Sequence, residues 1–68
     1  MKDKRKLLAE GIDCQKFIGR CAMKEISLMN IQYISDHSLT FFCYEKDYRQ
    51  VEKLAGNVYR LTTLAQSG

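Results

Sequence analysis

The spacing of the hydrophobic residues changes several times along this chain, and the order of those changes limits the folds that it can adopt. Between residues 14 and 22, apolar residues recur every three or four positions, which is the period of an amphipathic helix. From residue 26 to residue 44 they alternate instead, as in strands, with the turn-forming run SDHS at 35–38 between two such stretches. A second helical pattern follows at 47–55, and residues 58–64 are rich in strand-forming types. The sequence therefore predicts a mixture of helices and strands.

Both predicted helices have an apolar stripe and recognisable ends. The first stripe consists of Cys14, Phe17, Ile18, Cys21 and Ala22, and the second of Tyr48, Val51, Leu54 and Ala55. We expect Asp13 and Asp47 to cap the helix starts, because a carboxylate oxygen accepts hydrogen bonds from the free backbone amides there. Gly56 with Asn57 can end the second helix. Gly19 costs about 1 kcal/mol relative to alanine inside a helix, and we expect its missing side chain to let the helix approach the sheet.

Each predicted strand has two distinguishable faces. Residues 4–10 form a first short strand. In the second strand we expect Met29, Ile31 and Tyr33 on one face and Asn30 and Gln32 on the other. In the third strand the two faces carry Leu39, Phe41 and Cys43, and Thr40, Phe42 and Tyr44. Because both faces of the third strand carry bulky side chains, we expect this strand to be central in the sheet. We expect Phe41 and Cys43 to face the helices.

The resulting order, β-α-β-β-α-β, is that of the ferredoxin-like α+β fold. In this split sandwich a four-stranded antiparallel sheet has its first and third strands in the middle and both helices on one face. A chain of 68 residues makes one domain, which we place at 7–68 after a basic N-terminal tail at 1–6. The other sheet face then has no covering layer, which is typical of a surface that contacts RNA, another protein or a second copy.

The formal charge of +3 comes from the start of the chain, where four of the first six residues are basic and one is acidic. The rest of the chain is close to neutral. Charge that is confined to one end usually indicates a solvated tail or the approach to a strand, and it is weak evidence for nucleic acid. The candidate anion contacts are Lys4, Arg5, Lys6 and Arg60.

Groups that support catalysis or metal binding are scarce. His37 and Asp36 belong to the predicted turn, and Cys14, Cys21 and Cys43 lack the spacing of a zinc site. Isolated cysteines of this kind are typical of buried thiols in a reducing compartment. We therefore predict a non-enzymatic protein without cofactor or metal. Because no run approaches the ~18 apolar residues of a membrane span, and the start does not resemble a signal peptide, we expect it to be cytoplasmic.

Two functions use the open sheet face differently. We expect this face to be a protein-interaction or self-association surface that consists of Ile34, Phe42, Tyr44 and Tyr59. The alternative is a small RNA-binding module of RRM-like topology, in which aromatic residues of the first and third strands stack on bases. Phe42 and Tyr44 match half of that signature, but no basic residue and glycine precede them and the first strand has no aromatic residue. We favour the protein interaction.

The order of motifs in EGIDCQKF…ISLMNI…TFFCYEKDYR resembles the N-terminal domain of the YqfD family of sporulation membrane proteins. The matching residues are Gly11, Phe17, Cys21, Ile26, Leu28, Met29, Ile31, Thr40, Phe41, Lys46, Asp47, Tyr48, Arg49, Leu54, Ala55 and Gly68. The resemblance implies that this is a fragment, the cytosolic head of a longer bacterial protein that continues into a membrane-spanning segment. It also implies a domain without enzymatic activity, with membrane association only through a segment outside this sequence. Assembly is expected by analogy with the fold of related small αβ modules in sporulation and secretion proteins.

Overall fold

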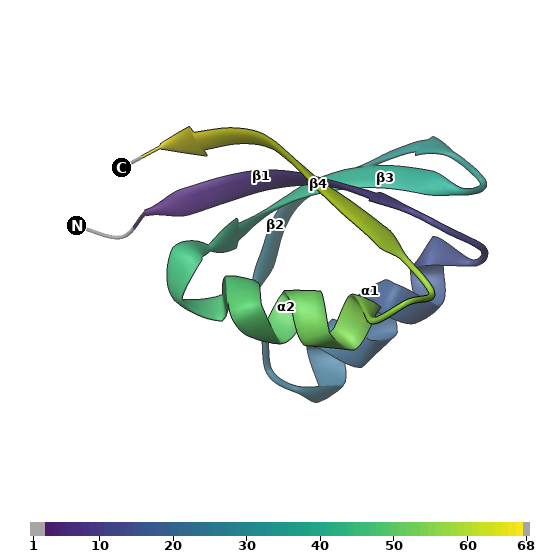
Figure 1. Ribbon diagram of the computed structural model, residues 1–68, viewed down its shortest axis with the longest axis horizontal. Helices are drawn as coiled ribbons and strands as arrows, with labels where there is room; N and C mark the ends of the chain where they lie inside the picture. Colours follow the sequence, from purple (N-terminus) through teal and green to yellow (C-terminus); the bar gives the residue numbers. More distant parts are fainter. Residues whose placement is uncertain (1–2, 68) are drawn as a thin grey trace.

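The computed structural model describes residues 3–67, and side chains as far as residue 64, as a four-stranded sheet with two helices against one face (Figure 1). The elements are β1 (Lys4–Glu10), α1 (Cys14–Met23), β2 (Leu28–Ser35), β3 (Ser38–Tyr44), the 3-10 turn η1 (Glu45–Asp47), α2 (Tyr48–Ala55) and β4 (Arg60–Ser67). All neighbouring strands are antiparallel, in the order β2-β3-β1-β4. The predicted ferredoxin-like α+β fold, with the first and third strands central, is confirmed.

The sheet begins earlier in the chain than the predicted domain boundary. Lys4 pairs with Tyr44 of β3 and with Ser67 of β4, so residues 4–6 belong to a central strand and not to a tail. Residues 1 and 2 of the predicted tail, and residue 68, lie outside the described residues. The basic residues of β1 are therefore held in register by hydrogen bonds on both sides.

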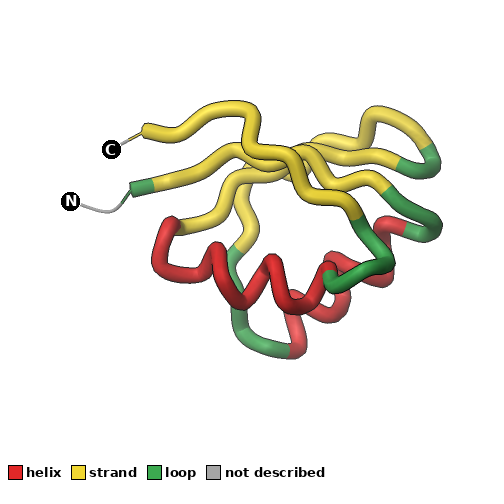
Figure 2. The backbone as a smooth tube through the Cα atoms, viewed as in Figure 1, coloured by secondary structure: helices red, strands yellow, loops and turns green. Residues whose placement is uncertain are grey.

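One hydrophobic core lies between the sheet and the helices (Figure 2). Its fully enclosed side chains are Leu7, Ala9, Phe17, Cys21, Leu39, Phe41, Cys43 and Val51. The ring of Phe17 on α1 lies 5.9 Å from that of Phe41 on β3, measured between centroids. The prediction that Leu39, Phe41 and Cys43 share the helix-facing side of β3 is confirmed by their complete burial.

The helix ends differ in part from the prediction. Asp13 and Asp47 do occupy the N-cap positions, but neither side chain makes a capping hydrogen bond. A capping side chain needs an extended backbone at its own residue, whereas Asp13 is left-handed, with φ 59°, and Asp47 is helical as the last residue of η1. Gly56, with φ 53°, ends α2 as predicted. Gly19 is exposed, and a Cβ there would meet no atom within 4 Å, so it does not bring α1 closer to the sheet.

A β-bulge in β2 overturns the predicted alternation of that strand. Met29 pairs with Phe42 and Gln32 pairs with Thr40, so three steps along β2 match two steps along β3. The extra residue is accommodated at Asn30, which has a left-handed φ of 51°. As a result Met29 and Gln32 lie on the same face of the sheet, while Ile31 packs against the core.

Candidate functional site

The sheet face away from the helices, here called the open face, carries no further layer among residues 3–67 (Figure 2). Its members follow from strand register, because side chains alternate between the two faces and the opposite set is buried under the helices. They are Lys4, Lys6, Leu8 and Glu10 of β1, Met29 and Gln32 of β2, Thr40, Phe42 and Tyr44 of β3, and Arg60 and Thr62 of β4. The open face is thus a mixed surface of apolar, aromatic and charged residues.

Two aromatic side chains lie on the central strand β3 of this face. Phe42 and Tyr44 are half-buried, which leaves part of each ring accessible. The Nζ of Lys6 lies 5.8 Å from the centre of the Phe42 ring, and the Nζ of Lys46 lies 6.0 Å from that of Tyr44. At these distances an ammonium group is attracted to the negative face of a ring. The predicted position of both aromatic residues is confirmed, whereas their role stays a prediction.

The other two residues of the predicted surface lie elsewhere. Tyr59 is only 5% exposed, its ring lies 5.1 Å from that of Phe17, and its hydroxyl donates to the carbonyl oxygen of Asp13 at 2.8 Å. Its assignment to the open face was wrong, because it precedes β4 and its ring enters the core. Ile34 is exposed, but it lines a hollow with Tyr33 beside the start of α1. The structure therefore brings together Phe42 and Tyr44 alone of the four.

Arg5 is not available as an anion contact, which corrects a second prediction. It lies on the helix side of β1, where its Nε donates to a carboxylate oxygen of Glu45 at 3.0 Å and its Nη2 donates to the other. Its Nη1 donates to the hydroxyl of Thr63 at 3.2 Å, and the guanidinium lies 4.0 Å from the centre of the Tyr48 ring. The hydrogen bond to Glu45 raises the pKa of Arg5. This side chain ties β1 to η1, α2 and β4.

The remaining candidate cations do lie on the open face. Lys4 and Arg60 are exposed and Lys6 is half-buried, and Glu10 is the one acidic member of the face. Lys46 of η1, which follows β3, adds a fourth cation at the edge of the face. Sequence reasoning missed Lys46, although its position two residues after Tyr44 was a usable signal. It also missed Met29, because the bulge was not foreseen.

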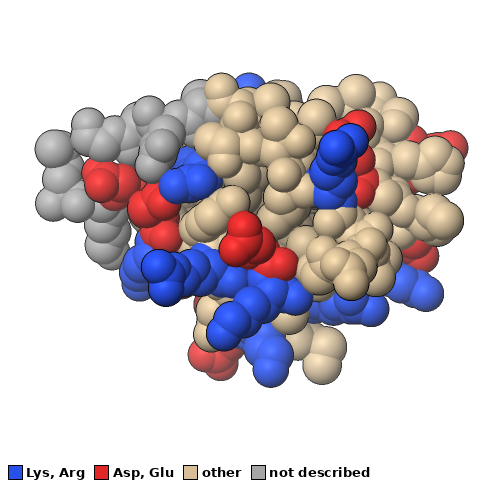
Figure 3. Space-filling model, in the orientation of Figure 1, with Lys and Arg blue, Asp and Glu red and all other residues tan. Residues whose placement is uncertain are grey.

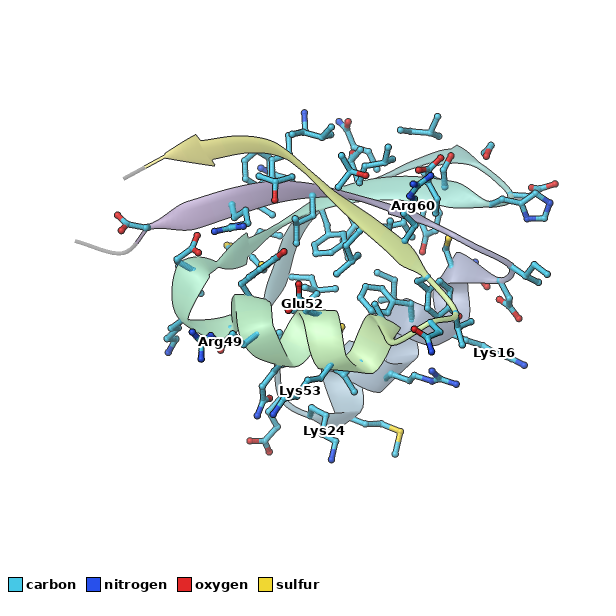
Figure 4. The ribbon with its side chains drawn as sticks, in the orientation of Figure 1. Lys16, Lys24, Arg49, Glu52, Lys53 and Arg60 are labelled. Carbon is cyan, nitrogen blue, oxygen red and sulfur yellow. The ribbon has the colours of Figure 1, made fainter. Side chains whose placement is uncertain are left out.

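Other basic residues belong to the opposite side of the molecule. Lys and Arg gather over the helices in the view of Figure 3. Lys24 and Lys53 extend from the helix layer away from the sheet, whereas Arg60 lies at the sheet (Figure 4). Lys24 and Lys53 line a hollow between the helices together with Gln50 and Leu54. The cations are therefore divided between two faces, and on the open face Lys6 and Lys46 lie close to aromatic rings.

The groups with chemical reactivity are buried or isolated. Burial raises the pKa of Cys21 and of Cys43 to about 11, and it also raises the pKa of Cys14. A thiol at such a pKa is neutral and a poor nucleophile at neutral pH. His37 is exposed in the turn between β2 and β3. Among residues 3–67 no three side chains that could bind a metal lie together, and no helix is long and apolar enough to cross a membrane.

Comparisons of this chain with protein families, with curated proteins and with solved structures found no match.

Proposed function

We propose that this chain is a non-enzymatic interaction domain that contacts a macromolecular partner through its open face. The single observation that carries this proposal is the pairing of a complete core on one side of the sheet with Phe42 and Tyr44 on the other. In a sheet that needs no partner, the middle of the solvated face is expected to carry polar residues. Here the two central strands instead carry the half-buried side chains of Leu8 and Phe42 beside the buried Thr40, and the edge strand β2 adds Met29.

A protein is one candidate for the partner. Protein interfaces combine an apolar or aromatic centre with a polar rim, and the open face has this arrangement, with Leu8, Met29 and Phe42 between Lys4 and Arg60. The resemblance to sporulation membrane proteins, and with it a cytosolic location beside a membrane, is part of this proposal. It would make the partner another component of the same assembly.

Charge favours an acidic partner over a second copy. Among the described residues, the open face carries Lys4, Lys6 and Arg60 against Glu10, and its edge adds Lys46, with Asp3 at the same end of β1. Two copies packed face to face would bring like charges together, and such juxtapositions are unfavourable. A partner with carboxylates or phosphates would instead neutralise these groups.

The proposal can be tested by replacing Thr62, an exposed member of the open face, with a photo-crosslinking amino acid in cells. Gln50 on α2 is the matched control, because it is also exposed but lies in the helix layer. We expect position 62 to form specific crosslinked products, identified by mass spectrometry, that disappear when Phe42 and Tyr44 are both changed to serine. Equal products from position 50, or products that survive the double change, would show that the open face is not the contact.

A further inference from the structure

The spacing of the two aromatic residues on β3 suits a particular kind of ligand. Phe42 and Tyr44 are two positions apart, so their Cα atoms are about 7 Å apart along the strand. Bases in a stacked helix are only about 3.4 Å apart, so two bases that stacked on both rings would have to be spread away from each other. A single strand allows this, and a duplex, which hides the faces of its bases, does not.

The cations of the open face are placed beside the rings. In the register of β1 with β3, Lys6 lies directly opposite Phe42, and Lys4 lies directly opposite Tyr44. Each accessible ring therefore has its own ammonium group in the neighbouring strand. A nucleotide presents one planar base and one phosphate, which is the same pairing of chemical groups. An acidic protein would supply carboxylates, but it would not require a cation opposite each ring.

Resting on the proposed function, we propose that the ligand of the open face is a single-stranded nucleic acid. Its bases stack on Phe42 and Tyr44, and its phosphates contact Lys4, Lys6, Lys46 and Arg60. Stacking on an aromatic side chain tolerates any base, because every base has a π-face. Among the described members of the face the one acidic residue, Glu10, lies opposite Arg60, at the end of β1 away from Lys4. Lys4, Lys6 and Lys46 therefore form the more positive end of the phosphate path, and Arg60 lies at its other end.

The first measurement is fluorescence anisotropy of labelled oligouridylate and oligothymidylate of about ten nucleotides, a length within the range of such sites. Contacts to four phosphates predict that the logarithm of the binding constant falls with the logarithm of salt concentration with a slope of about −3 between about 50 and 200 mM salt. We expect a duplex of the same length to compete poorly. A duplex that competes equally would overturn the proposal.

Variants separate stacking from simple charge attraction. We expect Phe42→Ala and Tyr44→Ala each to weaken binding about 5- to 140-fold. Phe42→Leu keeps an apolar side chain without the ring, and it should also weaken binding even if the alanine variant folds poorly.

Lys4→Gln with Lys6→Gln should reduce the salt slope by about 1.4. The matched control, Lys24→Gln with Lys53→Gln on the helix side, should leave the slope unchanged. Aromatic variants that bind like the parent, or controls that change the slope equally, would overturn the proposal.

The failure of this inference can be told apart from the failure of the proposed function. If neither oligonucleotide changes its anisotropy, the nucleic-acid ligand is overturned. If the crosslink at Thr62 still depends on Phe42 and Tyr44, the open face remains the binding surface, and its partner is a protein. If that crosslink does not depend on them, the proposed function falls as well.

Discussion

At the scale of single residues, two glycines have opposite surroundings. Gly19 lies in α1 with open space where a Cβ would be, whereas a Cβ on Gly11 would lie 2.7 Å from a ring carbon of Tyr59 and 2.8 Å from the carbonyl oxygen of Val58. We expect Gly19→Ala to raise the free energy of unfolding by about 0.5–1 kcal/mol through helix propensity. Gly11→Ala should lower it by about 1–3 kcal/mol through overpacking. Urea denaturation of both variants measures this, and the opposite ranking would contradict it.

Two buried thiols lead to a prediction about reactivity and pH. Because burial raises the pKa of Cys21 and Cys43 from 9.0 to about 11, their thiolate fraction at about pH 8 should be about 100-fold lower than in the unfolded chain. Above pH 9 the unfolded thiols ionise while the folded ones stay neutral. The contribution of the two neutral, buried thiols to the free energy of unfolding is therefore present below pH 9 and is lost between pH 9 and about 11.

Alkylation followed by mass spectrometry tests the reactivity directly. We expect Cys21 and Cys43 to be labelled slowly by iodoacetamide in the folded protein and rapidly in concentrated urea. Replacement of both cysteines by alanine should reduce the loss of stability above pH 9. Any loss that remains in this double variant comes from other groups that titrate there. Equal labelling of folded and unfolded protein would show that the two thiols are accessible.

At the scale of elements, β2 shows where a reading of periodicity fails. Alternation correctly placed Phe41 and Cys43 of β3, because that strand is regular and its two faces contrast. The same rule failed for β2, because an extra residue at a bulge reverses the face of the positions that follow it, and a second register shift lies between Tyr33 and Ser35. The hint in the sequence was Asn30, since asparagine adopts a left-handed backbone more readily than other side-chain-bearing residues. Alternation of apolar and polar residues cannot show at which residue of a strand the left-handed backbone occurs.

The bulge gives the next prediction. With φ 51° at Asn30, a β-branched residue would be strained there, and we expect Asn30→Val to lower the free energy of unfolding by about 1–2 kcal/mol. Asn30→Gly, which adopts this conformation without strain, should stay within about 0.5 kcal/mol of the parent. Chemical denaturation of the pair distinguishes the two cases. A valine variant as stable as the glycine variant would mean that β2 can pair without the bulge.

At the scale of the whole molecule, the order of elements was predictable because β-α-β-β-α-β leaves few compact arrangements of one small domain. The candidate site was predictable only in part. Phe42 and Tyr44 were located by alternation along a regular strand, whereas the position of Tyr59 depends on how the connection from α2 enters β4. Whether Arg5 can contact an anion depends on Glu45, which binds its guanidinium and lies forty residues later in the chain. Contacts between distant segments of this kind are set by the assembled fold and not by local pattern.

The charge of the open face makes a last prediction about the isolated chain. Like charges across a face-to-face dimer repel over a screening length of about 10 Å at 0.1 M salt and only about 3 Å at 1 M. We therefore expect sedimentation velocity over a hundredfold concentration range to show a monomer at 0.1 M salt. Any self-association should appear at 1 M and be abolished by changing Phe42 and Tyr44 to serine. Binding of a single-stranded nucleic acid must weaken over the same rise in salt. Salt therefore strengthens self-association and weakens nucleic-acid binding. A sedimentation coefficient that already increases with protein concentration at 0.1 M salt would favour a second copy as the partner.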